Sequence, residues 1–201
     1  MLVIDDFARE PDRLVEQAAA LRFAPNGAVF PGVRAPVPLS FCIALRQSLE
    51  ALIQKTFDID QPLERMESWY SLVTAPARSQ TLLQKLPHID GVGGRRIALV
   101  HHLGRSGRGG TAFYRHRATG FETVDPARLP GYNAAVNAEL RRGAGLLEIY
   151  EQVALYPARY NRLLIYRGDS LHGAVLPDDA ALTDDPRTGR FSINSFIWLD
   201  C

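Results

Sequence analysis

The segment PHID places two potential metal ligands, His88 and Asp90, two residues apart. Side chains two apart on an extended strand point to the same side, so both can reach one metal ion. The pair also fits a structural interpretation, because Asp90-Gly91 is a typical hairpin-turn dipeptide and the aspartate would then serve the turn. On its own, the pair is weak evidence for a metal site.

A second candidate ligand lies far downstream, in NRLLIYRGDSLHGAVL. There an apolar strand ends at a Gly168-Asp169 turn, and His172 follows with Gly173 beside it, a position from which a side chain can point into a cavity. His88, Asp90 and His172 would form a triad of two histidines and one carboxylate. Such a triad leaves three adjacent positions open on an octahedral ion and is typical of non-haem iron(II) enzymes.

The C-terminal segment RFSINSFIWL has the alternation of a strand. Its period of two predicts one face made of Arg190, Ser192, Asn194, Phe196 and Trp198. A guanidinium and a hydroxyl on the same face can hold a carboxylate in a pocket. The alternative is an edge-strand arginine paired with an acid of the protein.

Four segments, in their order along the chain, resemble the 2-oxoglutarate- and iron(II)-dependent dioxygenases, particularly their prolyl-hydroxylase-like branch. They are PHID, GGTAFYR, the strand with its GD turn and LHG, and the terminal RxS. The sequences of the segments PGVRAP, NRLLIYRG and DPRTGRFSINSF are similar to those of an uncharacterised bacterial family, a domain of unknown function. The resemblance implies a double-stranded β-helix. It also implies iron(II) bound by His88, Asp90 and His172, and 2-oxoglutarate as co-substrate, its distal carboxylate held by Arg190 and Ser192.

The stretch PDDAALTDDPRTG departs from that branch, because it lengthens the chain between His172 and the basic residue. Its prolines and aspartates predict an inserted loop. Arg187 is then a rival anchor for the carboxylate. Arg190 is preferred because Ser192 continues its strand alternation, whereas Pro186 and Gly189 place Arg187 in a turn.

Several other side chains are weaker candidates. Tyr114 is a possible further co-substrate ligand, while Tyr70 and Tyr166 fit core positions with a hydroxyl that reaches a cavity. His101 and His102 are adjacent, so on a strand they face opposite sides and do not easily share one metal. A hydrogen-bonded core histidine is the more frequent case for the one that points inward.

A basic cluster lies around the Gly109-Gly110 pair. It could bind an anionic substrate at the mouth of a pocket or could be a solvated loop, and the two interpretations are evenly matched. Its members are Arg105, Arg108, Arg115, His116 and Arg117.

Helices precede strands along the chain. A short strand is expected at 2–7, a helix from Pro11, and a second helix capped by Ser40 with Leu45, Leu49, Leu52 and Ile53 as its buried side. The prolines and glycines of 24–39 predict a long loop without regular structure. Strands follow from Trp69 to Leu199, interrupted by helical pieces at 126–142 and 146–156.

This order predicts an α+β fold: a jelly-roll, cupin-like double-stranded β-helix with N-terminal and inserted helices packed on it, as one domain over 1–201. No glycine-rich phosphate loop follows a strand, which argues against a nucleotide-binding α/β fold. Apolar residues make up 46% of the chain and charged residues 22%, the balance of an ordinary globular protein.

The net charge of +1 gives no field that would attract nucleic acid or a membrane surface, and we expect neither as a partner. The acidic start of MLVIDDFARE does not resemble a signal peptide, and Cys42 and Cys201 form no disulfide framework, so a cytoplasmic location is expected.

The main functional hypothesis is an oxygenase that hydroxylates a small molecule or a peptide, of unknown identity. One alternative is an inactive binding or accessory protein that keeps the fold and the metal. Another is a metal-dependent enzyme that does not use 2-oxoglutarate.

Overall fold

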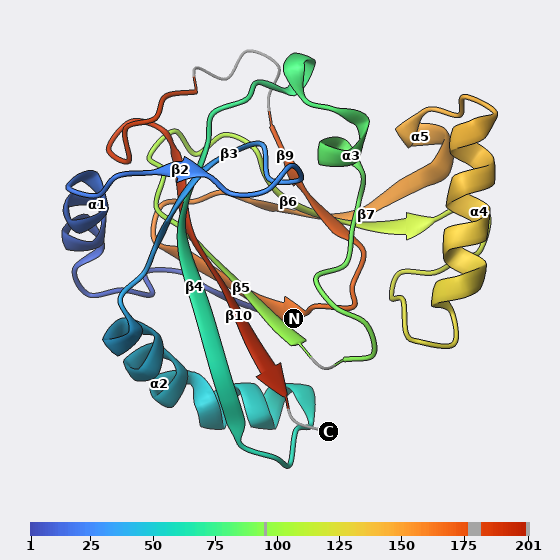
Figure 1. Ribbon diagram of the computed structural model, residues 1–201. Helices are drawn as coiled ribbons and strands as arrows, with labels where there is room; N and C mark the ends of the chain where they lie inside the picture. Colours follow the sequence, from blue (N-terminus) through green and yellow to red (C-terminus); the bar gives the residue numbers. More distant parts are fainter. Residues whose placement is uncertain (95, 177–181, 200–201) are drawn as a thin grey trace.

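The computed structural model describes residues 1–94, 96–176 and 182–199, and its strands form two antiparallel sheets that face each other (Figure 1). The seven-stranded sheet has the spatial order β1 (Leu2–Ile4), β8 (Arg162–Arg167), β5 (Arg96–His102), β10 (Arg190–Leu199), β4 (Leu63–Val73), β3 (Gly32–Pro36) and β2 (Ala24–Pro25). The three-stranded sheet has the order β7 (Tyr150–Pro157), β6 (Gly110–His116) and β9 (His172–Val175). This is the predicted α+β fold with a jelly-roll core.

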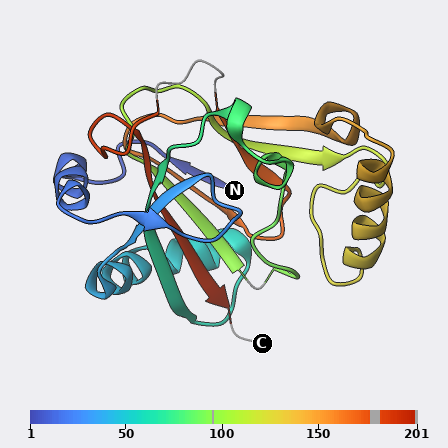
Figure 2. The ribbon, with the colours of Figure 1, turned by 45° about the horizontal axis from the view of Figure 1, so that its top comes forward.

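Helices cover the outside of this pair of sheets. α1 (Pro11–Ala19) and α2 (Leu39–Phe57) lie on the face of the large sheet that points away from the small one, as Figure 2 shows from a second direction. α4 (Leu129–Arg141) and α5 (Leu146–Ile149) lie beyond the end of the small sheet, and the short η1 (Ala77–Ser79) and α3 (Leu82–Lys85) follow β4. Among the described residues, no helix has the length and apolar character needed to cross a membrane.

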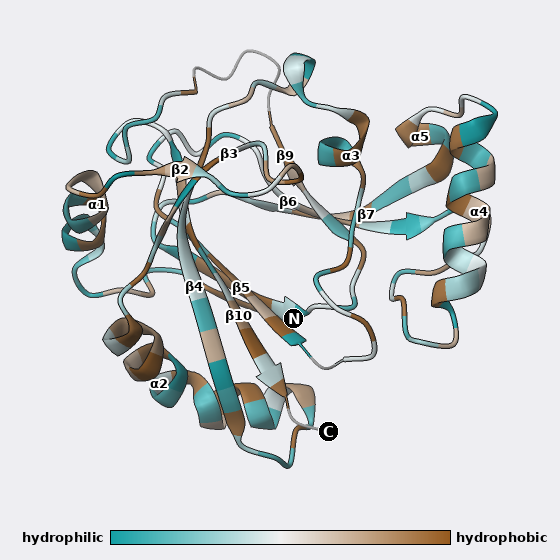
Figure 3. Ribbon diagram, in the orientation of Figure 1, coloured by the Kyte–Doolittle hydropathy of each residue, from teal (hydrophilic) through white to brown (hydrophobic). Residues whose placement is uncertain are grey.

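The main core lies between the large sheet and the helices. Along β10 the odd positions are buried against this core, while the even positions face the small sheet. Ile53 of α2 and Ile193 of β10 are fully covered here. Burial of each such side chain stabilises the fold by roughly 1.5–3 kcal/mol. Figure 3 shows the same two-sided character on β4, where hydrophilic and hydrophobic positions follow one another.

A second apolar cluster fills part of the space between the two sheets. It joins Ala98 of β5, Phe113 of β6 and Leu164 and Tyr166 of β8. The inserted helices pack on the small sheet through a third cluster that includes Tyr132 and Tyr150. The inter-sheet space is therefore closed at one end by side chains, and the cavity described below occupies the rest.

Two sequence predictions about this frame are wrong. Segment 24–39 contains β2 and β3, because a glycine- and proline-rich chain can still pair at the edge of a sheet when its prolines stand at strand ends, as Pro25 and Pro36 do. Segment 146–156 is helical only through α5; from Tyr150 it becomes β7, whose pairing with β6 outweighs its local helical preference.

Smaller differences concern element ends. β1 ends at Ile4, and Asp6 adopts a left-handed conformation with φ of 52°. Ser40 does not cap α2 but lies inside it. On the expected buried side of this helix, Leu49 and Ile53 are buried, whereas Leu52 is 39% exposed. The helix expected at 126–142 is confirmed as α4. Cys42 is buried with a free thiol, and Cys201 lies outside the described residues.

Candidate metal centre

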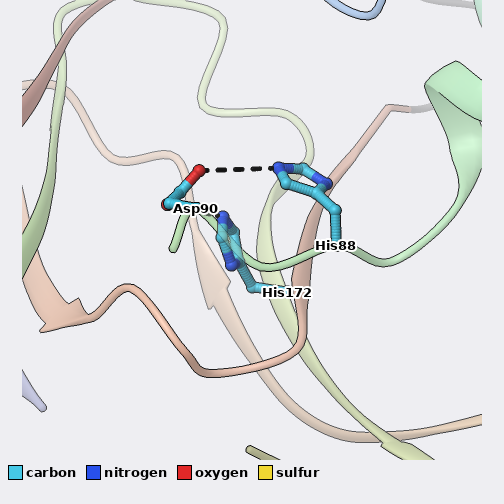
Figure 4. Close-up of side chains that lie close together, drawn as sticks. All are labelled: His88, Asp90 and His172. Carbon is cyan, nitrogen blue, oxygen red and sulfur yellow. Dashed lines mark ion pairs between the residues drawn. The ribbon is translucent and has the colours of Figure 1, made fainter. Parts of the chain in front are cut away.

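His88, Asp90 and His172 meet between the sheets. One ligand atom from each lies within 4.8 Å of the others. The Nε2 atom of His172 is 3.3 Å from Oδ2 of Asp90, and Nε2 of His88 is 3.9 Å from Oδ1. Figure 4 shows the three side chains pointing toward one another from two separate stretches of chain.

Backbone pairing holds these two stretches in register. The N–H groups of His88 and His172 each donate to the carbonyl of the other residue, at 2.8 and 2.9 Å. The backbone N–H of Asp90 donates to the carbonyl of Gly168 at 2.7 Å, so the Gly168-Asp169 turn fixes the position of Asp90. The Asp90 side chain accepts no hydrogen bond at Oδ2 from the described residues, and it therefore does not serve a turn.

The two imidazoles are oriented for a metal. Nδ1–H of His172 donates to the carbonyl of Ser170 at 3.0 Å, and Nδ1–H of His88 donates to that of Leu86 at 3.4 Å. A backbone acceptor at Nδ1 leaves the lone pair of Nε2 free to bind a metal. Two imidazoles with free Nε2 atoms beside a buried carboxylate oxygen fit a divalent transition-metal ion.

The charge state of His88 agrees with this orientation. The side chain is 50% exposed and lines the cavity, while neighbouring protein atoms desolvate the ring. This desolvation, together with the neighbouring His172, lowers the pKa of His88 to about 4. The ring is therefore neutral at physiological pH, as a metal ligand must be.

A cavity of about 340 Å³ opens in front of the triad. Its walls come from both sheets and from segments 26–31 and 80–86. Arg190, Ser192, Asn194 and Phe196 all line it, which confirms the predicted alternation of β10 at these positions. Ser192 Oγ donates to Asn194 Oδ1 at 2.8 Å.

Arg190 is the cationic end of this wall. Its Nη2 donates to the carbonyl of Gly110 at 3.0 Å, while its Nε is buried without a hydrogen-bond partner among the described residues. Burial lowers the pKa of Arg190 to about 10, so the guanidinium stays charged at neutral pH. The rival Arg187 instead lies at the surface, where it donates to Glu16 at 2.6 and 2.9 Å. The first part of the expected insertion, residues 177–181, lies outside the described residues.

Unsatisfied polar atoms are concentrated in this cavity. Five buried side-chain nitrogen or oxygen atoms of the described residues have no hydrogen-bond partner. Four of the five belong to lining residues: Arg34 Nε, Asp90 Oδ2, His102 Nε2 and Arg190 Nε. Buried polar groups are ordinarily paired, so their concentration here indicates a site for a polar ligand.

A family model described as a family of unknown function, DUF6445, matches residues 1–197. The chain belongs to the DUF6445 family. A comparison with curated proteins finds no match for this DUF6445 chain.

Solved structures of two proteins, HygX and SnoN, are similar to the DUF6445 chain. HygX from Streptomyces hygroscopicus, with nickel and 2-oxoglutarate bound, gives a TM-score of 0.54 at 12% identity over 98% of this chain and 82% of HygX. HygX with hygromycin B also bound gives 0.49 at 12% identity, over 98% and 81% of the two chains. SnoN, an α-ketoglutarate-dependent epimerase from nogalamycin biosynthesis, gives 0.46 at 10% identity, over 98% and 76%. At this identity, the first of these likenesses shows a shared fold.

Tyr114 does not line the triad cavity of the DUF6445 chain. Tyr114 follows a bulge in β6 and packs against the cluster that holds the inserted helices, where its ring meets Tyr150 at 6.3 Å between centroids. It lines a separate pocket of about 310 Å³. The tyrosine at the triad is Tyr166, whose ring centroid lies 4.8 Å from that of His172.

His101 and His102 face opposite sides of β5, as predicted. His101 points to the helices, where its Nε2 forms a 3.0 Å hydrogen bond with Asn161 Oδ1. His102 lines the cavity, and burial followed by the nearby charge of Arg190 lowers its pKa to about 3. It is therefore a neutral imidazole beside the proposed carboxylate anchor.

The basic cluster does not gather at the cavity. Arg105 pairs with Asp12, Arg115 with Glu122 at 2.6 Å, and Arg117 lies 4.0 Å from Glu151. His116 is buried, with its Nε2 2.8 Å from a carboxylate oxygen of Glu139 in α4. Of the two interpretations left open by the sequence, the structure favours the one without substrate binding, because three of the arginines pair with acids of the protein and the histidine anchors the inserted helix.

The sequence prediction missed one cavity residue of note, Arg34. It lies on β3, in a segment expected to be a loop, and it reaches the same cavity as the triad. The only sequence feature that could have indicated it is the strand-like run between Gly32 and Pro36.

Proposed function

We propose that this DUF6445 protein is a non-haem iron(II)- and 2-oxoglutarate-dependent oxygenase that acts on a small molecule or a peptide. The observation that supports this most is the arrangement of one cavity: His88, Asp90 and His172 offer free ligand atoms to it, and Arg190 with Ser192 lines it from β10. The fold shared with HygX agrees with this proposal.

Each residue has a defined task in this proposal. The triad would hold iron(II), and a facial triad leaves room on the ion for co-substrate and oxygen. Arg190 and Ser192 bind the distal carboxylate of 2-oxoglutarate, the guanidinium by charge and the hydroxyl as a second donor. Bound iron with 2-oxoglutarate and oxygen would supply the oxidising chemistry.

The apolar part of the cavity wall excludes water from the reacting groups. Leu99, Val100, Phe196 and Tyr166 line it on the side of the large sheet. Burial raises the pKa of Tyr166 well above its ordinary value, so its hydroxyl stays protonated. Electrostatic contacts are stronger in such a dry space, which favours ordered binding of an anionic co-substrate.

The alternative of an inactive binding protein rested on the insertion before Arg190, which could have displaced the carboxylate anchor. In the structure Arg190 still lies opposite Val73 in the β10–β4 ladder and lines the cavity. The insertion therefore gives no reason to prefer this alternative.

Anaerobic titration with iron(II) and then 2-oxoglutarate, followed by oxygen and a succinate assay, tests the proposal. We expect binding of both and oxygen-dependent succinate. His172→Ala should lose iron binding, Arg190→Met should lose 2-oxoglutarate affinity, and Arg187→Met is a matched surface control. Absence of iron binding would contradict the proposal, and iron binding without 2-oxoglutarate binding would favour a different metal enzyme or the inactive protein.

A further inference from the structure

Four polar side chains form one row across the large sheet. In the ladders that join β3, β4, β10 and β5, Arg34 lies opposite Ser71, Ser71 opposite Ser192, and Ser192 opposite His102. Directly opposed residues on adjacent strands point to the same face of a sheet. Arg34 therefore faces the cavity from β3, on the same side as the proposed co-substrate anchor.

The Arg34 side chain has unused hydrogen-bonding capacity. Its guanidinium carbon lies 4.0 Å from the ring centroid of Phe30, which supports one face of the group. Its Nε is buried, and within the described ranges the side chain has neither an ion pair nor a hydrogen bond. A guanidinium offers five N–H donors in a fixed fork, so this group is available for an oxyanion.

Arg34 is electrostatically coupled to the triad. Burial lowers the pKa of Arg34, and the negative charge of Asp90 partly opposes this effect. The Arg34 guanidinium and the Asp90 carboxylate line the same cavity.

After the proposed metal and co-substrate have bound, the positive charge of Arg34 has no counter-charge among the described residues of the cavity. Iron(II) with Asp90, and the 2-oxoglutarate dianion with Arg190, together sum to zero. Among the described lining residues, Arg34 and Lys85 then remain as positive charges without a counterpart. Burial of an uncompensated cation is unfavourable, so the remaining ligand should bring negative charge.

Beside the positive charge of Arg34, the cavity has an apolar surface at its mouth. Segments 26–31 and 80–86 meet there, and Gln84 Nε2 donates to the Ala28 carbonyl across them at 3.1 Å. Val29 and Leu83 line the mouth and are 52% and 57% exposed. A ligand at the mouth would therefore cover apolar side chains while its polar end reaches inward.

We propose that Arg34 binds an anionic group, a carboxylate or a phosphate, on the substrate of this enzyme, with the apolar part of that substrate against Val29 and Leu83. This inference rests on the proposed oxygenase function for the identity of the ligand as substrate. The anion site itself depends on Arg34 and its cavity.

The test uses the full chain loaded with manganese(II) and saturating 2-oxoglutarate. Hexanoate and hexyl phosphate are the anionic probes, and hexanamide is the neutral probe of matched length. Saturation-transfer NMR measures binding of each probe without reference to the metal, and manganese-induced broadening shows whether the bound probe lies near the triad. We expect both anions, or one of them, to bind at least about tenfold tighter than hexanamide, because a charge-assisted hydrogen bond contributes that much or more.

Variants assign this preference to Arg34. Arg34→Gln should remove the preference for the anions, Arg34→Lys should keep part of it, and Arg187→Gln should leave it unchanged. The 2-oxoglutarate affinity of Arg34→Gln, measured by calorimetry, should equal that of the wild type. The carboxylate and phosphate probes distinguish the two sources of the anion.

Two results would overturn the inference. One is equal binding of hexanamide and both anions to the wild type. The other is a loss of 2-oxoglutarate affinity in Arg34→Gln as large as that in Arg190→Gln, which would assign Arg34 to the co-substrate. Failure of the oxygenase proposal is distinguishable, because the chain would then bind no 2-oxoglutarate while its Arg34-dependent preference for the anionic probes, seen by saturation transfer, remained.

Discussion

At the scale of single residues, the cavity is marked by buried polar atoms that have no hydrogen-bond partner among the described residues. A buried donor or acceptor without a partner costs about 1–3 kcal/mol. Arg34, Asp90, His102 and Arg190 each have such an atom, and all four face the same space. His101, one residue from His102, has instead a hydrogen bond and a ring contact with Phe7 at 5.3 Å. The contrast separates a ligand-binding face of β5 from a structural one.

His101 should make stability depend on pH. Burial lowers its pKa to about 4, with the hydrogen bond to Asn161 acting in the opposite direction. Below the ordinary pKa of about 6.5, the unfolded state takes up a proton that the folded state does not accept until about pH 4, so stability falls as pH decreases through this window. The contribution reaches about 3 kcal/mol at the lower end.

Urea denaturation between about pH 7 and pH 4.5 measures this effect. The variant His101→Gln should be less stable at neutral pH but should lose less stability on acidification than the wild type. The difference between the two slopes therefore belongs to His101, including its effect on the pKa of the adjacent His102. Parallel pH profiles would contradict this assignment.

At the scale of elements, local patterns predicted the strands with strong alternation and missed those defined by pairing. β10 was predicted from its own residues because polar and apolar side chains alternate from Arg190 to Asn194. β3 and β7 were not, since β3 is flanked by proline and glycine and β7 follows directly on a helical turn. Both exist because a neighbouring strand supplies hydrogen bonds, and a single sequence does not show that neighbour.

The same distinction between local patterns and strand pairing applies to the residues of the candidate site. The triad was predictable because its spacing and the GD turn are local features around residues that bind metals. Arg34 was not, since its role follows from the register of four strands that are far apart in the chain. The placement of Tyr114 failed because the face of a strand depends on its register, which the segment itself did not fix.

Gly32 should control the position of β3 and hence of Arg34. A Cβ at Gly32 would overlap the carbonyl oxygen of Leu72, because β3 approaches β4 closely there. Gly32→Ala should push β3 away from β4 and cost about 1–3 kcal/mol of stability. It should also reduce the preference for hexanoate over hexanamide while manganese(II) and 2-oxoglutarate still bind.

Gly131→Ala is the matched control, because a Cβ at that position in α4 meets no atom within 4 Å. It should leave probe binding unchanged and should not lower stability. Urea denaturation and the NMR titration are run on both variants. Full retention of the anion preference in Gly32→Ala would show that the β3–β4 approach does not hold Arg34 in place.

At the scale of the whole molecule, the site lies between two sheets. They also contact each other through the apolar cluster of Ala98, Phe113, Leu164 and Tyr166 and through the hydrogen bond from Arg190 to Gly110. His172 belongs to the small sheet, and Arg190 to the large one. A metal and a dianion bound between them would connect the two sheets. Ligand binding should therefore be coupled to the stability of the entire fold.

Manganese(II) and 2-oxoglutarate should raise the thermal midpoint in sequence. Each ligand at a hundredfold excess over its Kd stabilises the folded state by about 2.7 kcal/mol, and for a chain of this size 1 kcal/mol corresponds to about 2–4 °C. The metal alone should therefore raise Tm by about 5–10 °C. In the proposed function 2-oxoglutarate binds to the ion as well as to Arg190, so it should add a similar increment only when the metal is present. Differential scanning calorimetry of three variants checks this. His172→Ala should abolish both increments, and Arg190→Met should keep the first and lose the second. Arg187→Met should behave as the wild type. A second increment that survives in Arg190→Met would place the carboxylate anchor on another residue of the cavity, and Arg34 is then the first to test.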